Sequence, residues 1–252
     1  MKKVLITGAN KGIGFEVARQ LARKGYHVFI GSRDLKNGLD AVNILKAEGL
    51  DNLEAVQLDV TNQQSVNAAR IEIGNKTDVL DILINNAGIN GIEFNGNTPV
   101  MHSALETGVD KFKEVYEVNV FGTIRTTQAF IDLLKRSPEP RIVNVSSSQG
   151  SLTLHSDPAY KYYKAKGAVY QSSKSALNMY TIALAFELRD TNFKVNAVSP
   201  PSTATDFNHH LGTSSVEVGA EHILRYTLLD NDGPTGKFFC VDNNPETGEI
   251  PW

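Results

Sequence analysis

The segment 170–174, YQSSK, holds two side chains that could share one chemical task. Tyr170 and Lys174 are four residues apart, so a helix would place them one turn apart on the same face. A phenol exchanges protons poorly at neutral pH, but a neighbouring ammonium stabilises the phenolate and lowers the phenol pKa. The pair could therefore perform general acid–base chemistry, with Tyr170 as the acid. The same pattern occurs at Tyr160 and Lys164, so spacing alone leaves two candidates.

A glycine-rich turn, TGANKGIG at residues 7–14, follows the first apolar run. Gly8 allows a sharp turn, Gly12 allows a pyrophosphate to approach closely, and Gly14 allows the following helix to pack against the strand. The N-terminus of that helix offers free amides and the positive end of its dipole to an anion. We therefore predict a dinucleotide site that includes Gly8, Asn10, Lys11, Gly12, Ile13 and Gly14. Glycines also mark ordinary turns, so the motif depends on the strand and helix around it.

The end of the second apolar run reads Ser32-Arg33-Asp34, and this position discriminates between nicotinamide cofactors. An acidic residue there accepts from the ribose 2′-hydroxyl of NAD, whereas an arginine accommodates the 2′-phosphate of NADP. Ser32 stands where the acid would be, and Arg33 and Lys11 supply two cations, so we predict a preference for NADP(H). One arginine can tolerate both cofactors, so NAD(H) is not excluded. The two cations could also be ordinary surface residues, and we expect Asp34 to cap a helix beginning at Leu35.

Two further turns follow expected strands. Asp59 and Val60 come after the third strand, and Asn86, Ala87 and Gly88 come after the fourth. Ligands of an open parallel sheet bind at the carboxyl ends of its strands, so these residues are predicted neighbours of adenine and ribose. Taken singly, Asp59 could equally cap a helix and Asn86 could equally form a tight turn.

Strand-like and helical segments alternate along the chain. Short runs rich in β-branched residues predict strands at 4–6, 27–30, 53–58, 80–84, 141–145 and 194–198. Apolar residues three to four apart predict helices between them, as at 13–21, 42–50 and 177–188. Apolar strands that alternate with helices form a parallel sheet covered on both faces. The predicted fold class is α/β, a single-domain Rossmann-type doubly wound parallel sheet with helices on both faces, over residues 1–252.

Turn-forming residues predict loops at 92–98, 135–140, 151–158 and 199–213. A strand-like patch at 237–241 precedes a tail rich in proline and glycine. Nothing has the composition of a linker, which favours one domain.

The composition excludes several classes of function. With 41% hydrophobic and 21% charged residues, the chain can form a sizeable core. A net charge of −3 argues against a nucleic-acid partner. Cys240 is the one cysteine, and the adjacent His209 and His210 lack further ligands, so we predict no metal and a reducing, cytoplasmic location. The apolar start is too short for a signal sequence or a membrane span, so no membrane partner is expected.

The chain resembles the short-chain dehydrogenase/reductase family over nearly its whole length, beginning with the spacing of its glycine turn. In that family a strand ends in a sequence like IVNVSS at 142–147, and its second serine is catalytic, which implies Ser147. The family's tetrad of Ser, Tyr, Lys and usually Asn implies catalytic roles for Ser147, Tyr170, Lys174 and Asn119. Asn119 resembles the helix asparagine that holds a proton-relaying water, although it could also be a buried asparagine that satisfies backbone groups.

The resemblance also bears on the choice of tyrosine. The Ser-to-Tyr interval most common in the family would select Tyr160. However, the pattern YxxSKxAL that begins at Tyr170 matches the start of the family's catalytic helix, and Lys174 precedes VNAV at 195–198 at the usual interval. We therefore assign Tyr170 and interpret the segment before it as an insertion.

The loop after the sixth strand should complete the cofactor site. The resemblance implies contacts from Pro200, Thr203 and Thr205, with the Thr203 backbone near the nicotinamide amide and Thr205 near the pyrophosphate. The family has Pro-Gly where this chain has Pro200-Pro201, and a second proline fixes φ and could reshape the loop.

The resemblance implies an activity. Hydride would pass from nicotinamide to a carbonyl carbon while Ser147 hydrogen-bonds the carbonyl oxygen and Tyr170 protonates it. Lys174 would also bind the nicotinamide ribose, so Tyr170 and Lys174 count among the cofactor contacts. The insertion, the closing GPTGKFF at 233–239 and the terminal Trp252 resemble the carbonyl reductase branch. We therefore expect NADPH-dependent reduction of a small-molecule ketone or aldehyde to an alcohol.

Other hypotheses stay open at this point. A non-catalytic, NADP-binding regulatory homologue would keep the fold, and an NADH-preferring ketoreductase would share every motif. A sugar-nucleotide epimerase would need a longer C-terminal domain, and an enoyl reductase would need a different glycine turn. The insertion has an intermediate length, so a monomer, dimer or tetramer is possible. We expect loops 89–100, 155–169 and 203–211 to select the substrate.

Overall fold

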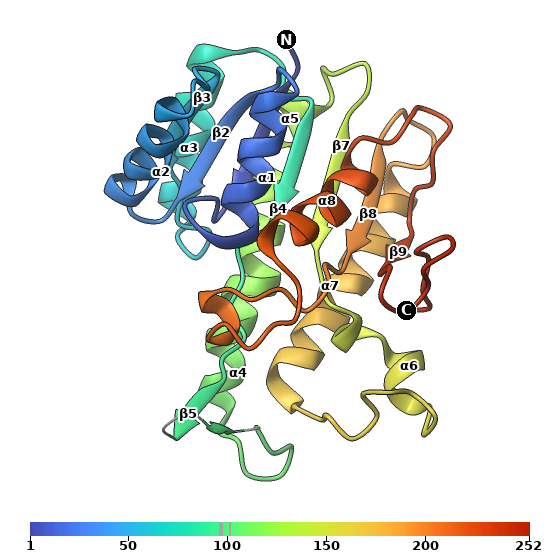
Figure 1. Cartoon of the computed structure of the whole chain (residues 1–252). Helices are drawn as coiled ribbons and strands as arrows, with labels where there is room; N and C mark the ends of the chain where they lie inside the picture. The colour runs from blue at the N-terminus through green and yellow to red at the C-terminus, as the bar shows by residue number, and fades with distance from the viewer. Residues whose placement is uncertain (96–97, 101) are drawn as a thin grey trace.

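The apolar runs form one parallel sheet in a computed structural model of the chain, which describes residues 1–95, 98–100 and 102–252 (Figure 1). The strand order is β3-β2-β1-β4-β7-β8-β9, and every pairing in this sheet is parallel. The strands are β1 (Lys3–Thr7), β2 (His27–Ser32), β3 (Leu53–Gln57), β4 (Ile82–Asn85), β7 (Arg141–Val145), β8 (Lys194–Val198) and β9 (Phe238–Phe239). The six predicted strands and the patch near the C-terminus are thus confirmed.

Helices cover both faces of the sheet because side chains alternate along each strand. On β1, Val4 and Ile6 belong to one buried cluster and Leu5 belongs to the other. Helices α1 (Gly12–Arg23), α2 (Leu35–Ala47) and α8 (Val216–Thr227) contribute to the first cluster, and α3 (Gln63–Lys76), α5 (Thr123–Leu134) and α7 (Ala168–Glu187) contribute to the second. This arrangement confirms the doubly wound α/β class.

Smaller elements lie beyond the carboxyl ends of the strands (Figure 1). They are the hairpin β5 (Glu93–Asn95) and β6 (Thr98–Val100), the helix α4 (Val109–Tyr116), the π-helix η1 (Glu117–Gly122), the 3₁₀ turns η2 (Ser148–Gly150) and η3 (Asp206–Asn208), and the helix α6 (Leu152–Ser156). The sheet order reverses between β1 and β4, which is where open α/β sheets bind ligands.

Three predicted loops contain regular structure, so these predictions were wrong in part. The described residues of loop 92–98 belong largely to the β5–β6 hairpin, while residues 96 and 97 lie outside the described residues. In loop 151–158 the Ser151 hydroxyl accepts from the Leu154 amide and caps α6. In loop 199–213 Thr205 and Asn208 form a capping box around η3. In the last two loops a local side-chain hydrogen bond stabilises a short element that periodicity does not indicate.

The two cap predictions have different outcomes. The Asp34 carboxylate accepts from the amides of Lys36 and Asn37, so Asp34 caps α2 as expected. Asp59 is not a helix cap, because its Oδ1 accepts from the amide and hydroxyl of Thr61 while Asn62 caps α3.

The C-terminal tail is ordered against the sheet edge. The Trp252 ring stacks on Phe238 with 5.3 Å between ring centroids, and the Thr153 amide donates to the Trp252 carbonyl. Within the described ranges, no helix is long and apolar enough to cross a membrane.

Candidate active site

A cavity of about 1210 Å³ opens at the carboxyl edge of the sheet. All of the predicted cofactor contacts line it: Gly8, Asn10, Lys11, Gly12, Ile13, Gly14, Arg33, Asp59, Val60, Asn86, Ala87, Gly88, Tyr170, Lys174, Pro200, Thr203 and Thr205. Ser147 lines it as well, whereas Asn119 is not among the lining residues. Residues from seven separate parts of the chain thus face one space.

The glycine turn has the conformation that an anion site needs. Gly8 and Gly12 have φ values of +63° and +61°, a region that side chains rarely adopt. A Cβ at Gly14 would collide with the Asn86 side-chain amide, which explains the third glycine. Lys11 stands at the N-cap of α1 and makes no side-chain cap hydrogen bond, so the helix N-terminus has no capping side chain. This turn fits a pyrophosphate.

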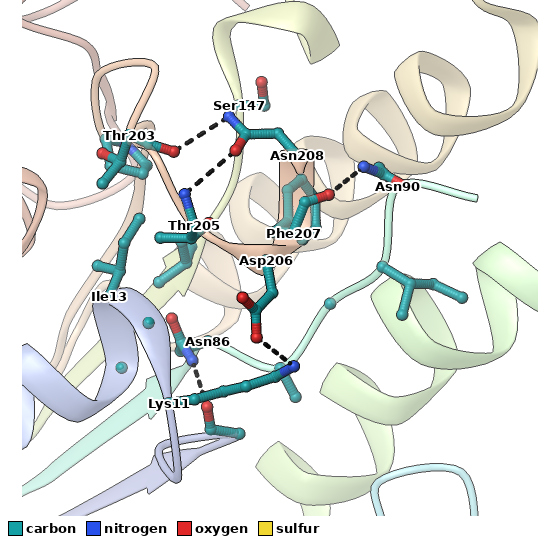
Figure 2. A pocket seen from close by; sticks show the side chains of 18 of the residues that line it. Lys11, Ile13, Asn86, Asn90, Ser147, Thr203, Thr205, Asp206, Phe207 and Asn208 are labelled. Carbon is teal, nitrogen blue, oxygen red and sulfur yellow. Dashed lines mark hydrogen bonds and ion pairs between the residues drawn. The ribbon is translucent and has the colours of Figure 1, made fainter. Parts of the chain in front are cut away.

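Asn86, the residue after β4, stabilises the glycine turn through side-chain and backbone hydrogen bonds. Its side-chain amide donates to the carbonyls of Thr7 and Gly8 at 2.9 and 3.1 Å, and Figure 2 shows the position of this side chain beside the turn. In return, the Thr7 hydroxyl accepts from the amides of Asn86 and Ala87. Asn86 therefore supports the cavity wall with its side chain.

The end of β2 presents a cation to the cavity. The Ser32 hydroxyl donates to the Asp34 carbonyl at 2.7 Å, so this side chain is already engaged within its own turn. Arg33 is exposed at the cavity, and its guanidinium makes no ion pair with any residue of the described ranges. An anionic ligand group could bind there.

Tyr170 and Ser147 meet inside the cavity. Tyr170 lies in the first turn of α7, Ser147 follows β7, and the Ser147 hydroxyl lies near enough to the Tyr170 phenol to lower its pKa. Burial raises the pKa of Tyr170 to about 12, and the nearby Ser147 hydroxyl only partly opposes this effect. The phenol is therefore protonated at neutral pH.

Lys174 lies one turn further along α7 and is 4% exposed. Burial lowers the pKa of its ammonium to about 8, and Nζ donates to the Val145 carbonyl at 2.9 Å. Nζ is 5.7 Å from the centroid of the Tyr170 ring. The expected lowering of the phenol pKa by Lys174 does not occur in the protein alone, because the desolvation of Tyr170 is the larger effect.

Asn119 lies in η1, where the helix widens into a π-turn, and is 1% exposed. Its side chain accepts from the Ile89 amide at 2.8 Å and donates to the Ile89 carbonyl and the Ser173 hydroxyl. It thus satisfies backbone groups and links the segment after β4 to α7. A Cβ at Gly88 would lie 3.2 Å from Asn119 Oδ1 and 3.7 Å from Lys174 Nζ, so both groups lie close to Gly88.

Tyr160, the competing tyrosine, does not line the cavity. Its hydroxyl accepts from the Asn243 side chain at 3.4 Å, and its ring packs edge-on against His155 and Tyr162. The structure therefore places Tyr170, and not Tyr160, beside Ser147.

The loop after β8 folds over the cavity through its own hydrogen bonds (Figure 2). The Asn208 side-chain amide donates to the Thr203 carbonyl, and its oxygen accepts from the Thr205 amide. The Phe207 ring packs edge-on against Tyr170 with 5.8 Å between centroids. Pro201 is thus accommodated in a loop that still brings Thr203 and Thr205 to the cavity.

Sequence reasoning missed several residues that line the cavity, among them Gln149, Cys240, Asp242 and Asn243. It placed others in the loops expected to select the substrate but did not single them out, among them Asn90, Tyr162, Asp206, Phe207 and Asn208. The Thr205-to-Asn208 spacing of a capping box was a signal for part of this group, whereas the segment after β9 carries no motif. Over the ranges that the structure covers, no group of three or more His, Cys, Asp and Glu side chains could hold a metal ion.

Comparisons with known proteins agree with this geometry. Residues 2–215 match the family model described as short chain dehydrogenase. (+)-Neomenthol dehydrogenase of Capsicum annuum is 35% identical, over 93% of this chain and 94% of the relative. The NADPH-bound carbonyl reductase from chicken fatty liver superimposes with a TM-score of 0.82 at 28% identity, covering 100% of this chain and 99% of the other. The NAD-bound 3-oxoacyl-[acyl-carrier protein] reductase from Brucella melitensis gives 0.77 at 28% identity, covering 94% and 88%.

Proposed function

Since the chain belongs to the short-chain dehydrogenase/reductase family, oxidoreductases that act on alcohol or carbonyl groups, we propose that it reduces ketones or aldehydes with NADPH and that Tyr170 is the proton donor. The observation that carries this proposal is that Tyr170 and Ser147 face each other inside a cavity that also contains the glycine turn. A proton donor and a phosphate-binding turn thus face one space.

The cavity fits a nicotinamide dinucleotide. The positive φ values at Gly8 and Gly12 and the absence of a capping side chain on α1 suit a pyrophosphate. Arg33 suits a 2′-phosphate, and a carbonyl reductase that superimposes on this chain was solved with NADPH bound. Another structural relative holds NAD, so both cofactors belong in the experiment.

The chain's own residues would handle the proton. When bound, the cofactor would supply the hydride. The Ser147 hydroxyl would hydrogen-bond the substrate oxygen, and the Tyr170 phenol, protonated because burial raises its pKa, would give its proton to that oxygen. The resulting phenolate would be stabilised by the Ser147 hydroxyl and by the ammonium of Lys174, which is mostly charged at pH 7.

The test compares two tyrosine variants in one assay. Nicotinamide absorbance is followed with NADPH and, separately, NADH against aryl ketones, α-keto esters and quinones. We expect Tyr170→Phe to lower kcat by about 10²- to 10⁴-fold, the usual contribution of a general acid. Tyr160→Phe is the matched control, and it should retain the wild-type rate because Tyr160 does not line the cavity.

Each outcome has a defined meaning. A wild-type protein that binds NADPH but reduces nothing in the panel would favour a regulatory function over catalysis. If Tyr160→Phe lost activity while Tyr170→Phe kept it, the assignment of the proton donor would be wrong. A higher kcat/KM with NADH than with NADPH would contradict the cofactor preference.

A further inference from the structure

Lys11 of the glycine turn forms an ion pair with Asp206, with 2.9 Å between Nζ and Oδ2 (Figure 2). Lys11 follows β1, whereas Asp206 begins η3 in the loop after β8. Strands β4 and β7 lie between β1 and β8 in the sheet. The pair therefore spans the carboxyl edge of the sheet, and both residues line the cavity.

Neighbouring groups hold the Asp206 carboxylate in place. Its Oδ1 contacts His210 Nε2 at 3.0 Å, and the adjacent Phe207 carbonyl accepts from the Asn90 side-chain amide. The pKa of Asp206 lies below its ordinary value, chiefly because Lys11 hydrogen-bonds the charged form. Asp206 is thus a fixed negative charge beside Lys11.

The two cations predicted for the 2′-phosphate differ in the structure. The turn after β1 and the end of β2 are neighbours, since Thr7 pairs with Gly31, and Lys11 and Arg33 both face the cavity. In the part of the chain that the structure describes, Arg33 forms no ion pair, whereas Lys11 pairs with Asp206. A 2′-phosphate would therefore compete with the Asp206 carboxylate for the Lys11 ammonium.

We propose that Asp206 is a specificity-determining residue that withholds Lys11 from the 2′-phosphate and so weakens the preference for NADP(H) over NAD(H). This inference rests on the proposed function only in requiring that the cavity bind a nicotinamide dinucleotide. The ligand group concerned is a phosphate monoester on the adenosine ribose. A cofactor without that group has no 2′-phosphate for Lys11 to bind, so we expect its affinity not to depend on Asp206.

The test measures binding without turnover. Isothermal titration calorimetry at low salt gives the dissociation constants of adenosine 2′,5′-bisphosphate and 5′-AMP, and of NADP⁺ and NAD⁺. Asp206→Asn should tighten the two ligands that carry a 2′-phosphate by about two- to fivefold, the range that an exposed ion pair is worth. It should leave 5′-AMP and NAD⁺ unchanged. The gain should shrink at high salt because exposed charges are screened.

Two further variants show whether the effect passes through Lys11. In a Lys11→Gln background, Asp206→Asn should no longer change any of the four dissociation constants. Asp132→Asn is the matched control, because Asp132 is also half-exposed and ion-paired, with Arg70 on the α3–α5 surface. It should reproduce only the general effect of removing one negative charge.

The outcomes separate this inference from the proposed function. If Asp206→Asn left the ratio of NADP⁺ to NAD⁺ affinity unchanged, or if its effect persisted in the Lys11→Gln background, the inference alone would be overturned. Wild-type protein that bound neither dinucleotide would overturn the proposed function and the inference together. Wild type that prefers NAD⁺, with a variant that gains NADP⁺ affinity, would support the inference while correcting the cofactor.

Discussion

Replacing Lys174 by methionine should change how the stability of the protein depends on pH. Lys174 is 4% exposed, and burial lowers the pKa of its ammonium to about 8 from an ordinary value of 10.5. In the unfolded chain this lysine binds its proton more tightly than in the folded chain. The wild type should therefore gain stability as the pH rises from about 8 toward 10.5, because the unfolded state holds more protons there.

The magnitude follows from the two pKa values. A difference from 10.5 to about 8 corresponds to roughly 3 kcal/mol of unfavourable interaction with the charged form at pH 7. Methionine keeps an apolar stem of similar length and carries no charge. It also leaves the Val145 carbonyl without its partner, but that cost does not depend on pH. The stability of Lys174→Met relative to wild type should therefore fall by about 2–3 kcal/mol between pH 7 and pH 10.

The assay is urea unfolding of both proteins at several pH values between 7 and 10, followed by circular dichroism without cofactor. Lys36→Met is the matched control, because the Lys36 side chain is 84% exposed and should show no such change. A stability difference between Lys174→Met and wild type that stays constant over this pH range would refute the reasoning. It would mean that the folded protein solvates the Lys174 ammonium as well as water does.

Two remaining predictions concern the pH dependence of activity and the capping of α2. The value of kcat/KM for the cofactor should fall above about pH 8, because Lys174 loses its charge there, and a profile that stays flat to pH 10 would contradict this role. Asp34→Ala should lower the free energy of unfolding by about 1 kcal/mol in urea, because Asp34 caps α2. Asp40→Ala on the same helix should have a smaller effect, and equal losses would argue against the cap.

Local features of this chain were predictable because their physics is local. The glycines at 8, 12 and 14 were recognisable since a tight turn between a strand and a helix requires residues without a Cβ. The strands were predictable because a parallel sheet buried on both faces needs apolar runs, and Asp34 was predictable as a cap because its partners are two and three residues away. Short elements such as α6 were not predicted, because a single side-chain hydrogen bond specifies them.

The two candidate tyrosines show what spacing alone could not decide, although the resemblance to the family favoured Tyr170. Two Tyr-x-x-x-Lys patterns were equivalent by spacing, and only the fold brought Tyr170 beside Ser147 and turned Tyr160 toward Asn243. The sequence predicted that Lys174 lowers the Tyr170 pKa, whereas burial raises it. Spacing indicates a charged neighbour but does not measure desolvation.

The sequence by itself determined the individual strands, the glycine turn and the residue types available for chemistry, since each depends on neighbours within a few positions of the chain. Only the tertiary structure decided which of those residues act together. Lys11 illustrates this limit, because its ion-pair partner Asp206 lies far along the chain, in a loop whose path depends on Asn208 and Asn90. The charge that a cofactor meets is therefore set by packing between distant segments, and no local pattern encodes it.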